Sequence, residues 1–320
     1  MQPDTSQYPL LEDVAEVFRG ESAVAKRDVR LPAELDAETR PLSASMELEF
    51  LAEVGALVYP DRVLVGMRDV RWFLRASEPS SSAARLVGRA RREGDGEVSV
   101  FLSVEPVSTG TNTGGSSEEA TEEPIPVCRA ILHFEQNYGP APWPQQQRML
   151  APKSENLQNG RQLYASVGGQ GDRVPESLQV VSWARLCELG RIQGGLIHPR
   201  AMAKVLPASR IQVAPAALEG ALHLVKWLWY SFSGEGSREM AISEATWFRM
   251  PRRDERLMCD ARLSGASSGL ASFDAHLLGQ DGIPVLELRG IAMASLPSED
   301  LAPTLPRLSW QSFVKSLSPR

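Results

Sequence analysis

Cysteine and histidine, which build most disulfides and many metal sites, are scarce in this sequence. Its 320 residues contain four histidines and three cysteines, Cys128, Cys187 and Cys259. The cysteines are far apart and odd in number, which excludes a disulfide scaffold or a CxxC metal site and predicts a cytoplasmic protein. The nearest two histidines, His198 and His223, are themselves widely separated, so we expect neither a histidine-ligated metal nor another cofactor.

Long apolar runs and an excess of positive charge are also missing. The longest apolar stretch, 214–232, is interrupted by Glu219, His223 and Lys226 and does not predict a membrane span. The N-terminus has no apolar core of a signal peptide. With 34 basic and 40 acidic residues the net charge is −6, which argues against nucleic acid or an anionic membrane as a partner. The sequence also contains no GxSxG, P-loop or GxGxxG motif.

Two apolar segments have the composition of buried helices. The first covers about 44–59 and ends before Pro60, and the second covers about 215–229 with Pro215 in its first turn. Apolar residues occupy most of the circumference of the first helix, so we expect it to be covered on several sides. Trp227, Trp229 and Tyr230 extend the second helix and are expected to pack in the core.

Strand patterns surround these helices, and the arrangement occurs twice. Trp72-Phe73 and Trp247-Phe248 follow the two helices at nearly the same distance along the chain, which indicates a duplicated α+β unit. Recurrence of helix and strands by chance is the alternative. The predicted strands are 17–31, 63–74, 85–92, 98–104, 127–135, 178–183, 186–189, 240–250, 257–263, 270–278 and 285–294.

Three segments have the composition of connections or tails. Residues 108–123 are rich in Thr, Gly, Ser and then Glu, which predicts a disordered insertion. Residues 146–160 are expected to be a linker, and 299–320 a tail with a short amphipathic helix. These boundaries divide the chain into an N-terminal unit, 1–145, and a C-terminal unit, 161–298.

Several motifs, in this order along the chain, resemble those of the double-hotdog dehydratase domain of polyketide and polyunsaturated fatty acid synthases. They are 8–11 (YPLL), 47–54 (ELEFLAEV), 65–72 (VGMRDVRW), 213–223 (VAPAALEGALH) and 281–285 (DGIPV). The resemblance implies an α+β double hotdog, in which 1–145 and 161–298 each wrap an antiparallel sheet around a long central helix. It also implies acyl carrier protein and neighbouring synthase domains as partners, and leaves open whether the chain forms a homodimer.

The family eliminates water from a 3-hydroxyacyl chain, using a histidine base from the first hotdog and an aspartate acid from the second. Here the stretch matching the histidine motif, 35–44, contains no histidine, and none precedes His133. Asp36 or Glu38 could replace that base only with a strongly raised pKa. The family's His-Gly-Pro element corresponds to 173–175, which reads Arg-Val-Pro.

The acid position is partly kept, because Glu219 stands where the family has aspartate. His223 follows four residues later, so the two share a helical face and can hydrogen-bond. They are either a residual acid with its orienting partner or a buried pair left from ancestry.

The sequence therefore predicts a dehydratase-like domain with a degenerate catalytic centre and a structural or carrier-docking role. The alternatives are an active 3-hydroxyacyl-[acyl carrier protein] dehydratase that uses Glu219 with a substitute base, and a hotdog protein that binds or hydrolyses acyl thioesters. In the last case Glu49 or Glu53 would activate water.

Overall fold

A computed structural model describes most of the chain and divides it into two compact units. The described residues are 8, 10–11, 13–18, 20–30, 42–73, 83–106, 124–142, 157–167, 179–187, 190–197, 211–252, 254–267 and 269–296. The first unit comprises 1–64, 70–136 and 208–212, and the second 65–69, 137–207 and 213–320. The expected insertion 108–123, the tail 299–320 and most of the expected linker lie outside the described residues.

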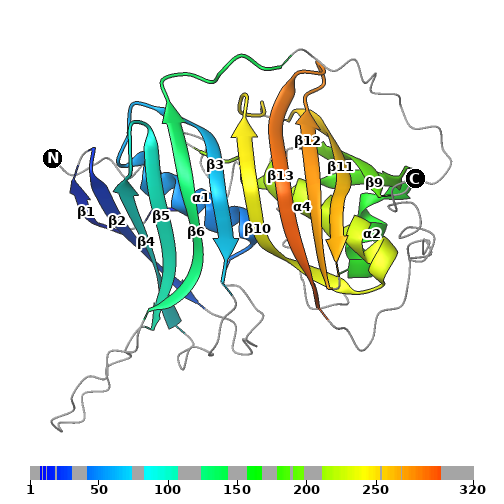
Figure 1. Cartoon of the computed structure of the whole chain (residues 1–320), viewed down its shortest axis with the longest axis horizontal. Helices are drawn as coiled ribbons and strands as arrows, with labels where there is room; N and C mark the ends of the chain where they lie inside the picture. Colours follow the sequence, from blue (N-terminus) through cyan, green and yellow to red (C-terminus); the bar gives the residue numbers. More distant parts are fainter. Residues whose placement is uncertain are drawn as a thin grey trace, which may run out of the picture. The chain divides into compact units, whose positions relative to one another are not determined.

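The first unit consists of one long helix and a sheet (Figure 1). Its sheet has the order β1-β2-β4-β5-β6-β3, and the pairings from β1 to β6 are antiparallel. The helix packs against β4 and β5. The elements are β1 (Asp13–Phe18), β2 (Ser22–Arg30), α1 (Ala44–Ala56), β3 (Val63–Trp72), β4 (Ala83–Arg92), β5 (Glu97–Pro106) and β6 (Ile125–Glu135).

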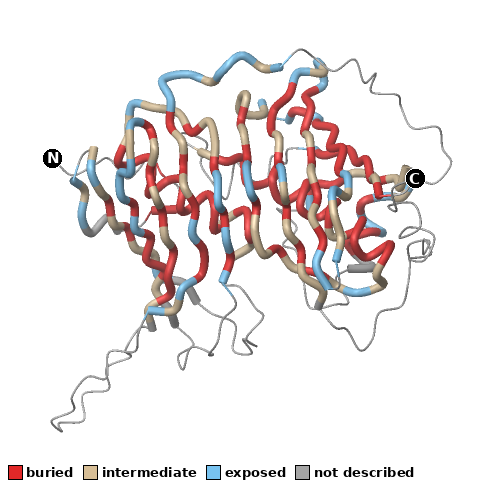
Figure 2. Tube along the Cα trace, viewed as in Figure 1, coloured by how far each residue is buried: buried red, intermediate tan, exposed pale blue. Residues whose placement is uncertain are grey.

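The second unit repeats this plan and adds a short helix. Its strands follow the order β10-β13-β12-β11-β9-β8-β7, with antiparallel pairing throughout. The elements are β7 (Gln158–Asn159), α2 (Gly160–Val167), β8 (Val181–Leu186), β9 (Arg191–Ile197), α4 (Pro215–Ser233), β10 (Gly236–Trp247), β11 (Arg256–Ser267), β12 (Leu270–Leu278) and β13 (Pro284–Leu296). The helix α4 contacts β8 to β12. Its trace is mostly coloured as buried in Figure 2, which has the same view as Figure 1.

Both long helices are buried along nearly their whole length, as the sequence predicts. Glycines in the strands, which have no side chain, let each sheet approach its helix closely. A Cβ atom at Gly88 of β4 would lie 2.8 Å from Phe50 on α1, and one at Gly194 of β9 would lie 2.7 Å from Leu224 on α4. Each unit thus encloses its helix tightly enough to bury the helix's polar side chains.

The two tryptophans that suggested a duplication occupy equivalent places. Trp72, at the end of β3, donates from Nε1 to Glu47 Oε2 on α1 at 2.8 Å. Trp247, at the end of β10, donates from Nε1 to the Val213 carbonyl oxygen, just before α4, at 3.2 Å. The residue that follows each tryptophan also donates its backbone N–H to a neighbouring strand: Phe73 to Val127 of β6, and Phe248 to Val285 of β13. This correspondence supports an internal duplication.

Some sequence predictions of local structure are wrong. The single strand expected at 17–31 is a hairpin of β1 and β2, which turns at Gly20 with φ of 77°. The strand expected at 186–189 does not begin where predicted: β8 ends at Leu186 and Cys187 belongs to no strand, while 188–189 lie outside the described residues. The next strand, β9, was missed because Gln193, Gly194 and Gly195 interrupt its apolar pattern. Within the described ranges, no helix is long and apolar enough to span a membrane, and no cluster of three potential metal ligands occurs.

Candidate functional site

The predicted site residues lie together on α4 in the second unit. Ala214 precedes the helix in the left-handed region, with φ of 52°, and Pro215 begins it. Glu219 and His223 follow on one helical face and are each 4% exposed. His223 Nε2 lies 3.2 Å from Glu219 Oε1. The predicted pairing is therefore present, in the core of this unit.

A third residue, Tyr164 of α2, joins this pair and was not foreseen from the sequence. Its hydroxyl lies 3.2 Å from His223 Nδ1 and accepts the backbone N–H of Val181 at 3.2 Å. Since the hydroxyl accepts from Val181, its own proton is available for His223 Nδ1. On the other side of the ring, His223 Nε2 faces Glu219.

Local sequence explains how Tyr164 reaches the site. The helix α2 begins at Gly160, where a Cβ atom would collide with the carbonyl oxygen of Val181. Glycine therefore allows α2 to lie directly against β8. Burial raises the pKa of Tyr164, and the charge of Glu219 raises it further. The tyrosine accordingly stays protonated, so its hydroxyl can donate to His223 Nδ1 as well as accept from the backbone.

Aromatic packing fixes the orientation of the imidazole. The rings of Tyr164 and His223 meet edge to face with centroids 5.4 Å apart, and the Trp227 ring stacks on His223 at 6.3 Å. Trp227, Trp229 and Tyr230 are all buried, which confirms the prediction that they belong to the core. Chemically, the arrangement holds the Glu219 carboxyl in one position as a hydrogen-bond acceptor, and a carboxyl so placed can exchange a proton with a ligand that reaches it.

Two stretches that the resemblance connects with the active site are not among the described residues. The stretch 35–41 and the residues 173–175, which match two further active-site elements of the resembled family, lie outside the described residues. Asp36 and Glu38 are in the first of these stretches. The sequence shows that neither stretch contains a histidine, since the first histidine of the chain is His133 and 173–175 reads Arg-Val-Pro.

The carboxylates suggested for thioester hydrolysis, Glu49 and Glu53, are completely buried on α1. Glu49 accepts the backbone N–H of Gln212 at 2.7 Å, and Glu53 accepts that of Leu10 at 2.8 Å. Burial and the nearby charge of Glu49 raise the pKa of Glu53 to about 9. Both carboxyls therefore hold backbone segments in place, an arrangement unsuited to activating water.

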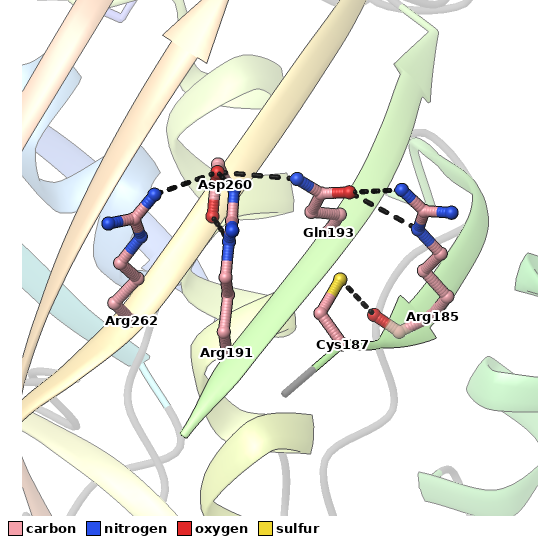
Figure 3. A network of polar contacts seen from close by, with 6 residues as sticks. All are labelled: Arg185, Cys187, Arg191, Gln193, Asp260 and Arg262. Carbon is pink, nitrogen blue, oxygen red and sulfur yellow. Dashed lines mark hydrogen bonds and ion pairs between the residues drawn. The ribbon is translucent and has the colours of Figure 1, made fainter. Parts of the chain in front are cut away.

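A separate polar network on β8, β9 and β11 was also missed (Figure 3). Arg191 donates to both carboxylate oxygens of Asp260, and Gln193 Nε2 donates to Asp260 Oδ2 at 3.3 Å. Arg185 in turn donates to Gln193 Oε1 at 2.6 Å. Although burial raises the pKa of Asp260, the hydrogen bonds and charge of Arg191 lower it more. No sequence signal could reveal this cluster, because it depends on the pairing of β9 with β11.

Comparison with known proteins identifies the fold. Neither a family model nor a curated protein matches the chain. Among solved structures, a dehydratase domain of a mycocerosic acid synthase-like polyketide synthase is 16% identical over 93% of this chain and 99% of its own, with a TM-score of 0.66. An inactive His-to-Phe mutant of CurJ dehydratase, in complex with a compound, is 13% identical over 91% of this chain and 97% of its own, with a TM-score of 0.67.

An inactive Asp-to-Asn mutant of CurK dehydratase is likewise 13% identical, over 91% of this chain and all of its own, with a TM-score of 0.66. The chain thus has the double-hotdog fold of polyketide synthase dehydratase domains, which confirms the predicted fold class and the resemblance.

Proposed function

We propose that this chain is a dehydratase-like domain of a polyketide or polyunsaturated fatty acid synthase whose catalytic centre is degenerate. Its role is structural, spacing the neighbouring synthase domains or holding an acyl carrier protein in the cytoplasm. The observation that carries this proposal is the absence of histidine from the first 132 residues of a chain that keeps the double-hotdog fold.

The chemistry explains why one missing group matters. Elimination of water from a 3-hydroxyacyl thioester needs a base for the α-proton and an acid for the leaving hydroxyl. A well-positioned proton-transfer group contributes about 10²–10⁴-fold to the rate, which corresponds to about 3–5 kcal/mol of transition-state stabilisation. The inactive His-to-Phe and Asp-to-Asn mutants among the structural neighbours are consistent with this cost.

The remaining acid position also differs from the family's. Glu219 is one methylene longer than aspartate, and catalytic geometry must hold within about 0.5 Å. Its carboxyl is 3.2 Å from His223 and is buried in the core of the second unit. These contacts support the interpretation that Glu219 and His223 satisfy each other's hydrogen-bonding groups and stabilise the second unit.

The test is a dehydration assay on the purified chain. A 3-hydroxyacyl pantetheine or a carrier-bound 3-hydroxyacyl chain is incubated with the protein, and mass spectrometry follows the loss of water. We expect no enzyme-dependent product from the parent chain, Glu219→Gln or His223→Ala. The exposed Glu244 supplies a matched control, Glu244→Gln. Retained binding of the carrier protein without turnover would support docking.

One observation favours a second candidate, an active dehydratase with Glu219 as its acid. The hydrogen bonds from Tyr164 through His223 to Glu219 are the kind that position a catalytic carboxyl. Under this alternative the parent chain turns over, and Glu219→Gln abolishes turnover while Glu244→Gln does not. Asp36→Asn and Glu38→Gln would then identify the substitute base. That result would overturn the proposal of a degenerate centre.

A further inference from the structure

Two phenylalanines lie on the solvent side of the first unit's sheet, where a polar surface is expected. Phe101 of β5 faces away from α1, because its neighbour Leu102 is fully buried and strand residues alternate between the two faces. Phe73 follows β3 and is 36% exposed, and the two ring centroids are 6.3 Å apart. A pair of adjacent aromatic rings on this face differs from the single apolar residues found on most surfaces.

Arginines flank these rings. In the strand register, Phe101 lies between Arg89 of β4 and Arg129 of β6. The guanidinium of Arg129 is 6.0 Å from the centroid of the Phe73 ring. Arg91, two residues after Arg89, and Arg71, two residues before Phe73, are also exposed. We call this set the Arg–Phe patch: Arg71, Phe73, Arg89, Arg91, Phe101 and Arg129.

The positive charge of the Arg–Phe patch is only partly neutralised. Arg89 forms an ion pair with Glu105 at 3.1 Å and donates to Ser103 Oγ at 3.0 Å. Within the described part of the chain, Arg71, Arg91 and Arg129 have no ion pair. The patch therefore has an excess of positive charge on a chain whose net charge is −6.

We propose that the Arg–Phe patch binds an acidic protein segment that presents an apolar side chain. Aromatic residues and arginine are the residue types enriched at the energetic centres of protein interfaces. The guanidinium groups would pair with carboxylates, and an apolar side chain would cover the two rings. A protein partner is favoured over nucleic acid because nucleic-acid-binding domains are usually basic as a whole. This inference is independent of whether Glu219 is catalytic.

The experiment measures binding of labelled probes to the whole purified chain by fluorescence anisotropy. The probes are a glutamate-rich peptide with regularly spaced leucines, the same peptide with serine in place of leucine, and a single-stranded oligonucleotide of similar charge. We expect the leucine-containing peptide to bind most tightly. Its affinity should fall with added salt, because exposed ion pairs are screened.

Substitutions locate the binding surface. Arg91→Glu and Arg129→Glu should each weaken binding about tenfold or more, and Phe73→Ala should remove the advantage of the leucines. The controls are Arg256→Glu, which changes another exposed arginine, on β11, and Phe18→Ala, which changes an exposed phenylalanine on β1. Circular dichroism should show that all of these exposed variants remain folded. If Arg91→Glu alone folds poorly, Arg129→Glu and Phe73→Ala still decide the question.

Three results would overturn the proposal. They are no salt-dependent binding of either peptide, equal losses in the patch variants and their controls, or tighter binding of the oligonucleotide than of both peptides. The last result would instead assign the surface to nucleic acid. None of these binding measurements depends on dehydration activity. Failure of the binding proposal can therefore be distinguished from failure of the proposed function.

Discussion

The imidazole of His223 is held at both nitrogens, by Glu219 one helical turn earlier and by Tyr164 from another helix. Both distances are 3.2 Å. A histidine held in this way has one ring orientation, and its neighbours have little freedom to move independently. The three side chains therefore form one hydrogen-bonded cluster, which we call the Tyr–His–Glu cluster.

Replacement of Tyr164 tests directly whether the Tyr–His–Glu cluster stabilises the fold. Tyr164→Phe removes the acceptor of the Val181 N–H and the hydrogen-bond partner of His223 Nδ1, and leaves both buried groups unsatisfied. We expect a loss of about 1–3 kcal/mol in the free energy of unfolding, measured in urea. Tyr59→Phe is the control, since the half-buried Tyr59 hydroxyl donates to Gly94 where water can replace it. A Tyr164→Phe variant no less stable than the control would contradict the structural role of this network.

Sequence reasoning found the helical pair but missed the tyrosine, for a physical reason. Glu219 and His223 are four residues apart on a strongly apolar helix, so their proximity follows from helix geometry alone. Tyr164 is 59 positions from His223, and its place depends on how α2 packs against β8. The two central helices were likewise predictable from composition, whereas β9 was not, because its glycines are required by contacts with Leu224 and Trp183.

Glu53 predicts an unusual dependence of stability on pH. Its pKa is raised from 4.5 to about 9, so the folded chain retains a proton that the unfolded chain releases. The stability that this proton contributes is complete below pH 4.5 and is lost as the pH rises towards 9, at up to about 1.4 kcal/mol per pH unit. Glu53→Gln keeps an acceptor for the Leu10 N–H and should flatten this slope.

The measurement is urea unfolding of the parent and variant between pH 5 and pH 9, expressed as the slope of free energy against pH. Glu244→Gln is the control, because this exposed side chain has the same chemistry without the burial. Identical slopes for the parent chain and Glu53→Gln would show that Glu53 is ionised in the folded state.

The polar network in Figure 3 predicts unequal roles for two arginines that face the same carboxylate. Arg191 makes two hydrogen bonds to Asp260, whose side chain is only 5% exposed. Arg262 is 3.6 Å from Asp260 and is half exposed. Arg191→Ala should therefore cost about 2–4 kcal/mol by leaving a buried charge poorly paired, and Arg262→Ala less than about 1 kcal/mol. Chemical denaturation of both variants makes the comparison, and equal losses would contradict it.

Replacing Gly220, next to Glu219 on α4, by alanine has two opposite effects on stability. Alanine is favoured over glycine within a helix by about 1 kcal/mol. At this position, however, a Cβ atom would lie 2.7 Å from Val180 Cγ2 and 2.9 Å from Leu196 Cδ2, and overpacking of a core costs about 1–3 kcal/mol. We expect the steric cost to prevail, so that Gly220→Ala lowers the melting temperature.

Gly265→Ala on β11 is the control, because no atom lies within 4 Å of its Cβ position, and it should be neutral or slightly stabilising. A Gly220→Ala variant more stable than the parent would mean that α4 separates easily from Val180 and from Leu196 of β9, and that this packing does not fix the position of Glu219.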